Sequence, residues 1–104
     1  MELAGLGRFA DPAVLILSSL AGGDKHGYAL IKDIDEFASV TLGPGTLYGA
    51  LARLEERGLV EALPSQDRRR PYRLTRAGAQ ALQSYLHHAR TVATVGLRRL
   101  ATSS

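Results

Sequence analysis

Arginine side chains are concentrated in one short part of this 104-residue sequence. Seven of the thirteen Lys and Arg residues lie between Arg53 and Arg76, and three of them form the run 68–70. The guanidinium group stays charged, and its planar array of donors matches phosphate geometry. Such a cluster predicts a polyanionic partner, either nucleic acid or an anionic membrane surface. The competing interpretation is a solvated basic surface that balances acidic residues elsewhere.

Charge is distributed unevenly along the chain, although the formal net charge is only +3. Residues 1–67 contain five basic residues and all ten acidic residues. Residues 68–104 contain eight arginines and no acid. The formal charge is therefore −5 for residues 1–67 and +8 for residues 68–104.

Other kinds of site chemistry have little support in the sequence. There is no cysteine, so thiolate catalysis and cysteine metal sites are excluded. Neighbouring helical residues such as His87 and His88 point about 100° apart, which makes them poor ligands of one metal ion. No phosphate-binding GxxxxGK[ST] loop occurs, and "GLGRFA" is too incomplete for a dinucleotide fingerprint. We therefore expect neither an enzyme nor a bound metal or cofactor.

The N-terminal sequence predicts a cytoplasmic protein. "MELAGLGRFADP" lacks the basic start and long apolar stretch of a signal peptide. The longest apolar run, "AVLIL", is far too short to span a bilayer. We expect no membrane partner.

Three helices are predicted in the first half of the chain. "DPAVLILSSLAGG" has a candidate N-cap in Asp11 and a proline at the first helical position. "HGYALIKDIDEFAS" places Leu30, Ile31, Ile34, Phe37 and Ala38 on one face. The third helix covers 43–57, with Pro44 at its start and a glycine, Gly58, as the C-terminal cap.

The pattern changes after Gly58. "LVEAL" and "PYRL" read as two short strands, and the basic connection between them makes the segment 64–71 the tip of a β-hairpin. Thr75 is the predicted N-cap of a last helix that continues to about Leu100.

Three helices, a basic hairpin and a trailing helix describe a winged helix-turn-helix. We expect a mainly α fold with a small β-hairpin. Residues 1–76 would form the DNA-binding domain, including an N-terminal helical extension over 1–10. Residues 77–104 would form a C-terminal dimerisation helix. The fold alone does not establish DNA binding, because winged helices also bind proteins.

Three segments resemble the PadR family of bacterial transcriptional regulators. They are "HGYALIKDI" (26–34), "GTLYGALARLEERGLVEA" (45–62) and "RRRPYRLTRAGAQAL" (68–82), in the order and spacing of that family. The single helix after the wing is similar to the shorter PadR subgroup. The chain departs from the family in Asp67-Arg68, where many members have a glycine before the wing arginines, and in Gly49, where proline is common. The resemblance implies a dimeric winged-helix repressor.

The candidate DNA-binding residues come from the third helix, the wing and the second helix. A recognition helix presents its N-terminal residues to the base edges of the major groove. Arginines on a wing suit phosphates or a narrow minor groove. For Tyr48, packing against the second helix is an equal alternative, and for His26 and Tyr28 we favour a structural role. The predicted set is Pro44, Gly45, Thr46, Tyr48, Gly49, Arg53, Arg68, Arg69, Arg70, Arg73, Lys32 and His26.

The last helix predicts a homodimer interface. Its apolar residues recur every three or four positions and have no obvious partner within a compact winged helix. A two-fold partner would set the half-site spacing of a palindromic operator; the alternative is that the helix folds back on its own domain. The predicted interface residues are Leu3, Leu6, Phe9, Leu82, Tyr85, Leu86, Ala89, Val92, Ala93, Leu97 and Leu100.

The sequence thus predicts a homodimeric, effector-responsive repressor that binds double-stranded DNA through the helix 43–57 and the wing 64–71. The resemblance implies a small apolar or aromatic effector between the dimer helices, although this chain has no tryptophan to clamp it. The alternative function is a protein-interaction module whose basic face binds an acidic partner.

Overall fold

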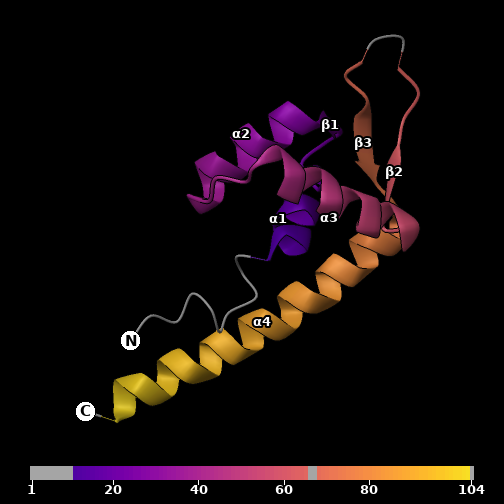
Figure 1. Cartoon of the computed structure of the whole chain (residues 1–104). Helices are drawn as coiled ribbons and strands as arrows, with labels where there is room; N and C mark the ends of the chain where they lie inside the picture. Colours follow the sequence, from indigo (N-terminus) through magenta and orange to yellow (C-terminus); the bar gives the residue numbers. More distant parts are fainter. Residues whose placement is uncertain (1–10, 66–67, 104) are drawn as a thin grey trace.

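The computed structural model of the chain describes residues 11–65 and 68–103 (Figure 1). Its elements are α1 (Pro12–Leu20), β1 (Lys25–His26), α2 (Gly27–Ala38), α3 (Pro44–Glu56), β2 (Val60–Ala62), β3 (Pro71–Leu74) and α4 (Arg76–Thr102). The β2–β3 hairpin projects from one end of the molecule, and α4 extends away from the other (Figure 1). In the described ranges, no helix is long and apolar enough to cross a membrane. The winged helix-turn-helix predicted from the sequence is confirmed.

The predicted helix starts agree with the structure because each has a cap in the sequence. The Asp11 carboxylate accepts a hydrogen bond from the Ala13 amide at 2.9 Å. The Thr75 hydroxyl accepts one from the Gly78 amide at 3.0 Å. At α3 the backbone of Gly43 is the cap, and Pro44 takes the first helical position.

The end of α3 is a left-handed glycine turn. Gly58 has φ +74°, a conformation that glycine adopts without strain. The Gly58 amide donates to the Glu55 carbonyl at 3.0 Å, and the Leu59 amide donates to the Leu54 carbonyl at 2.9 Å. These two bonds form a Schellman motif, which satisfies the last carbonyls of the helix.

The sheet has three antiparallel strands in the order β1-β3-β2. Val60 pairs with Leu74 and Ala62 with Tyr72, as the predicted hairpin requires. The first strand was not predicted: Lys25 pairs with Tyr72, so β1 covers the outer edge of the hairpin. A two-residue strand carries no alternation in sequence, and its pairing depends on residues almost fifty positions away.

The hydrophobic core is built mainly from α1, α2 and α3, with α1 at its centre. Ile16, Leu30, Ile34, Leu47, Leu51 and Val60 are almost completely buried. Leu82 of α4 is 6% exposed and belongs to the same core. Leu82 is therefore a core residue of its own chain, and the first turns of α4 pack with the winged helix across the expected boundary after residue 76. The dimer interface itself stays a prediction.

A polar cluster joins α1, β1 and α2 beneath the wing. The hydroxyl of Ser19, which is buried, donates to the Asp33 carboxylate at 2.6 Å. The Lys25 ammonium donates to the Ser19 carbonyl at 2.5 Å and lies 3.9 Å from Asp33. Lys25 thus binds a carbonyl at the C-terminal end of α1, where a cation is favoured by the helix dipole. These contacts fix the start of α2 relative to α1.

Candidate nucleic-acid interface

The front of α3 is exposed on one side and buried on the other. Leu47, Ala50, Leu51 and Leu54 face the core. Pro44, Gly45 and Thr46 are exposed, and among the described residues no side chain caps the first amides of this helix. The first turn therefore presents backbone donors and one hydroxyl group to an approaching ligand.

Two glycines leave the outward side of α3 without projecting side chains at their positions. A Cβ added at Gly45 would have no described atom within 4 Å, and at Gly49 it would meet only the Arg53 guanidinium, at 3.7 Å. Neither glycine is therefore required by internal packing. Gly45, Gly49 and Arg53 follow each other at i, i+4 and i+8, which places them in one row along the helix surface.

Tyr48 is partly exposed and also packs on α2. Its side chain is 50% exposed beside this row. It also packs on α2, because a Cβ added at Gly27 would lie 2.7 Å from the Tyr48 ring carbon Cζ. Gly27 is buried beneath the ring, so its missing side chain makes room for Tyr48.

The start of α2 lies beside Tyr48. The half-buried His26 caps this helix, since its Nδ1 accepts from the Ala29 amide at 3.3 Å. This contact supports the structural role that we favoured for His26. Tyr28, however, is 73% exposed, which corrects the structural role expected for it. Lys32 lies one turn further along α2 and is also exposed.

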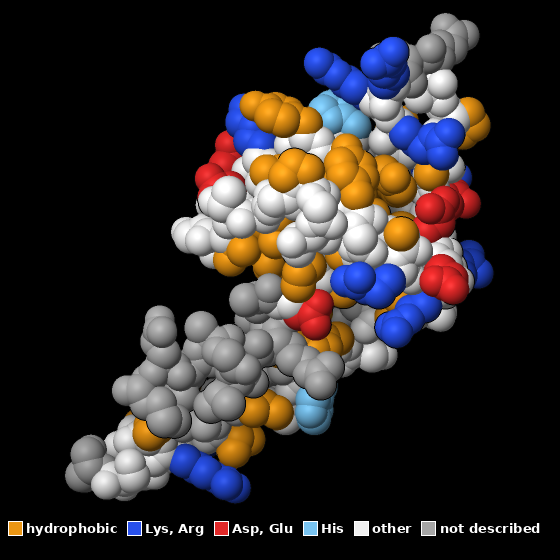
Figure 2. All heavy atoms as spheres, in the orientation of Figure 1, with side chains coloured by type: hydrophobic (Ala, Val, Ile, Leu, Met, Phe, Trp, Pro, Cys, Tyr) orange, Lys and Arg blue, Asp and Glu red, His pale blue; other side chains and the backbone are white. Residues whose placement is uncertain are grey.

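The wing presents arginine side chains to solvent. Arg68, Arg69 and Arg70 are all exposed, and Lys and Arg side chains gather at this end of the molecule (Figure 2). Arg73 lies on β3 opposite Glu61 of β2, and its Nε donates to the Glu61 carboxylate at 2.9 Å. This hydrogen bond, together with the carboxylate charge, raises the pKa of Arg73 above its usual value. Arg73 is thus partly neutralised by its neighbour.

Tyr72 is the second residue of β3. It is half-buried, pairs with both β1 and β2, and packs against the core. Burial, followed by the charge of Glu55, raises the pKa of its phenol above the usual value. Tyr72 therefore remains neutral at physiological pH and acts as a packing group.

The outer part of α4 carries an exposed apolar stripe. Leu86 is 42% exposed, and both Leu97 and Leu100 are 69% exposed. These residues lie on the same helical face as the buried Leu82, so the core-facing stripe continues beyond the core. Val92 is 57% exposed on the adjacent face, and Tyr85 and Ala89 are half-buried. The interface residues predicted in the N-terminal segment, Leu3, Leu6 and Phe9, lie outside the described residues, as does the extension 1–10.

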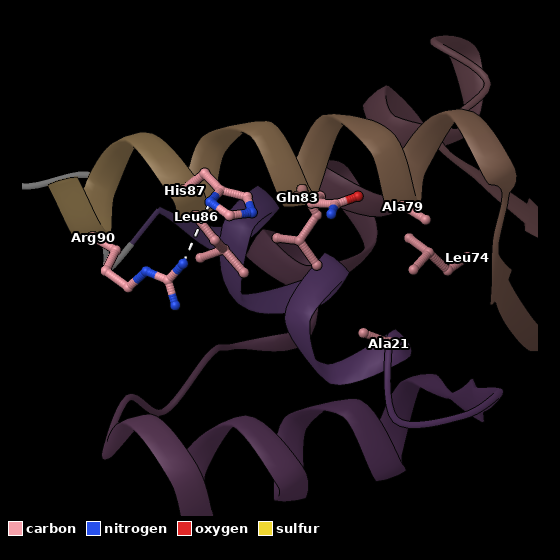
Figure 3. Close-up of a pocket in the computed structure, with 8 residues that line it drawn as sticks. Ala21, Leu74, Ala79, Gln83, Leu86, His87 and Arg90 are labelled. Carbon is pink, nitrogen blue, oxygen red and sulfur yellow. Dashed lines mark hydrogen bonds between the residues drawn. The ribbon is translucent and has the colours of Figure 1, made fainter.

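A groove of about 370 Å³ lies where α4 leaves the winged helix (Figure 3). Its walls are mostly apolar, with Leu74 from β3, Ala21 at the end of α1, and Leu82 and Leu86 from α4. His87 and Arg90 line one end, with 3.5 Å between the Arg90 guanidinium and His87 Nδ1. The described residues include no group of three or more His, Cys, Asp or Glu side chains that could hold a metal ion.

Comparison with known proteins agrees with this geometry. The model of the transcriptional regulator PadR-like family matches residues 16–84. The chain belongs to the PadR-like family. A PadR family transcription regulator from Clostridium difficile superposes with a TM-score of 0.77 at 30% identity, covering 90% of this chain and 99% of that one. A transcriptional regulator from Clostridium thermocellum gives a TM-score of 0.73 at 29% identity, covering 84% and 87%.

Two curated relatives are much longer than this chain. An uncharacterized 37.1 kDa protein in transposon TN4556 of Streptomyces fradiae is 46% identical over 80 residues, which is 77% of this chain and 23% of that protein. The transcriptional regulator YqjI of Escherichia coli is 35% identical over 72 residues, which is 67% of this chain and 35% of YqjI. The matched family is one of transcriptional regulators.

Proposed function

We propose that the chain is a homodimeric repressor that binds a palindromic operator. The observation that carries this proposal is the exposed front of α3 beside the arginine wing. Pro44, Gly45 and Thr46 are open to solvent on a helix that is held to the core by four buried side chains. A recognition helix enters the major groove with its N-terminal residues towards the base edges, and the exposed first turn of α3 suits that position.

Each part of this surface has its own task. The first turn of α3 and Thr46 approach the base edges, and Gly45 and Gly49 allow the helix backbone to come close to the DNA. Arg53 reaches a base or a phosphate from the next turns. Arg68, Arg69 and Arg70 bind the flanking backbone or minor groove, and Lys32 binds a phosphate beside α2. Tyr28, which was not in the predicted set, adds an exposed side chain at the start of α2.

The dimer forms through α4. Leu86, Leu97 and Leu100 expose an apolar stripe to solvent on a helix of 27 residues, which favours burial against a second copy. Ala89, Ala93, Val92 and Tyr85 complete the interface, and a two-fold axis would place two α3 helices on successive major grooves. An effector would bind in the groove beside Leu82 and Leu86, where it contacts both α4 and the winged helix. It shifts the dimer only if it binds the two states unequally.

The proposal is tested by selecting DNA from a library of random duplexes and from genomic fragments, then measuring affinity across a salt series. Each phosphate contact contributes about −0.9 to the slope of log K against log salt concentration. We expect a slope of about −4 or steeper, a palindromic consensus and two chains per duplex. If no duplex binds at low salt, DNA binding is excluded, and a basic surface for an acidic protein partner becomes the better explanation.

A further inference from the structure

The junction between α3 and α4 is held by the hydroxyl group of Thr75. This hydroxyl donates to the Gly58 carbonyl at 2.7 Å and accepts from the Gly78 amide at 3.0 Å. Gly58 is the left-handed residue that ends α3, and Gly78 lies in the first turn of α4. One side chain therefore bonds the end of one helix and the start of the other.

The backbone strengthens the same junction. The Thr75 amide donates to the Leu59 carbonyl at 3.2 Å. That carbonyl lies against Gly78 so closely that a Cβ on Gly78 would overlap its oxygen, with Leu74 Cδ1 only 2.8 Å away. One helical turn later, Leu82 is buried in the core. Thr75, Gly78 and Leu82 are spaced by three and four residues, so α4 is attached along one face of its first two turns.

Beyond Leu82, α4 continues for 20 residues to Thr102, whereas the attached part spans only Thr75 to Leu82. The part from Gln83 to Thr102 is roughly 30 Å long at 1.5 Å per residue. A rotation of about 10° at the base would move the far end by roughly 5 Å, which exceeds the rise of about 3.4 Å per base pair. A small change of angle at the junction therefore moves the far end of α4 by more than one base-pair step.

We propose that the Thr75 hydroxyl is a positioning group that sets the angle between α3 and α4, and thereby the half-site spacing that the dimer accepts. The spacing part rests on the proposed function, whereas the angle is a property of the single chain. A simple N-cap would require only the bond from the Gly78 amide. The additional bond to Gly58 connects the cap to the recognition helix.

Two substitutions separate these roles. Thr75→Asp keeps a good N-cap acceptor for Gly78, but a carboxylate cannot donate to the Gly58 carbonyl. Thr75→Ser keeps both bonds and is the matched control. Because Asp preserves the cap, Thr75→Asp is expected to remain folded, which circular dichroism and thermal unfolding would verify.

The first measurement needs no DNA. The chain has no cysteine, so cysteines introduced for Glu56 on α3 and Thr94 on α4 can be spin-labelled selectively. Both positions are exposed, and dilution with unlabelled chain removes distances between subunits. We expect one narrow distance distribution for the wild type and Thr75→Ser, and a broader or shifted one for Thr75→Asp. An unchanged distribution in Thr75→Asp overturns the proposal, even if the chain binds DNA as proposed above.

The second measurement uses a duplex selected by the wild type, with its half-site spacer lengthened or shortened by one or two base pairs. The added charge of Asp weakens binding to every duplex, so the readout is the affinity ratio between spacers. We expect Thr75→Asp to lower the preference for the selected spacer about fivefold, the effect of losing one hydrogen bond, and Thr75→Ser to retain it. Equal preferences in Thr75→Asp and the wild type contradict the assignment. A wild type that selects no duplex refutes the proposed function, while the label distances still decide the role of Thr75.

Discussion

The ring of Tyr48 on α3 lies directly over Gly27 at the start of α2. A Cβ on Gly27 would be 2.7 Å from Tyr48 Cζ, well inside normal contact. The glycine therefore fixes where a half-exposed tyrosine stands on the proposed DNA-binding face. This pair connects the two helices of the helix-turn-helix near their N-terminal ends.

Gly27→Ala is expected to lower DNA affinity about fivefold, because the methyl group displaces the Tyr48 ring from its place on the surface. Stability should change little, since the end of a flexible side chain can rotate into solvent. Fluorescence anisotropy with a selected duplex measures the affinity. The control is a double-mutant cycle with Tyr48→Ala, in which Gly27→Ala should have almost no further effect. Equal losses in both backgrounds would show that Tyr48 is not the cause.

Gly78→Ala is expected to destabilise the fold by about 3 kcal/mol or more. Its Cβ would overlap the carbonyl oxygen of Leu59, a backbone atom that also accepts the Thr75 amide. Urea unfolding followed by circular dichroism measures the loss. Gly49→Ala is the matched control, because its Cβ meets only a flexible guanidinium, and it should raise the free energy of unfolding by roughly 0.5–1 kcal/mol. Equal destabilisation by the two substitutions would contradict the close contact at Gly78.

Helix ends could be predicted from the sequence because their signals are local. Asp11, Pro44, Gly58 and Thr75 each act on backbone groups within a few residues of themselves. The same signals placed α3 within one residue of its observed bounds at each end. The strand β1 could not be found this way, since its stability comes from pairing with β3.

Exposure was harder to predict than helical phase. Phe37 lies beside Ile34 on the apolar face of α2, yet it is 51% exposed because the core ends before this last turn. Tyr28 was expected to be structural, but no described element covers it. Leu82 belongs to the same apolar stripe as Leu97, and only the packing against α1 and the hairpin separates a core residue from a surface residue. Periodicity predicts which way a side chain points. Whether another element covers that side chain depends on the whole fold.

Gly49→Ala is expected to lower affinity for DNA even though it stabilises α3. The glycine lies in the exposed row with Gly45 and Arg53, and a methyl group there would keep the helix backbone from approaching the base edges. We expect a loss of about tenfold for a single half-site duplex, equivalent to roughly 1.4 kcal/mol. Gly96→Ala adds the same methyl group to α4, far from the wing, and should leave half-site affinity unchanged. Unchanged binding by Gly49→Ala would mean that this row does not face DNA.

Glu61→Gln is expected to raise DNA affinity about two- to threefold at low salt. The Glu61 carboxylate binds Arg73 on the neighbouring strand. Its removal frees the Arg73 guanidinium and also removes one negative charge that repels the DNA phosphates. The gain should disappear above about 0.5 M salt, because exposed charges are then screened over a few ångströms. Titration at two salt concentrations measures it. Glu36→Gln, on the outer surface of α2, removes the same charge without an arginine partner in the described structure and serves as the control. A larger gain from Glu36→Gln would contradict a special role of the Glu61–Arg73 pair.

Leu97→Glu is expected to convert the proposed dimer to a monomer at micromolar concentration. Leu97 is 69% exposed on the stripe that continues the core-facing side of α4. Burial of a leucine is worth about 1.5–3 kcal/mol, and a two-fold interface contains the residue twice, so the dimer dissociation constant should rise about 100-fold or more. Thr91→Glu places the same charge on the opposite, polar side of the helix and should leave the dimer intact. Sedimentation velocity measures both, and binding to one half-site and to a full palindrome gives the consequence for DNA. The monomer should retain affinity for one half-site and lose the additional affinity for the palindrome. A dimer that survives Leu97→Glu but dissociates in Thr91→Glu would place the interface on the other face of α4.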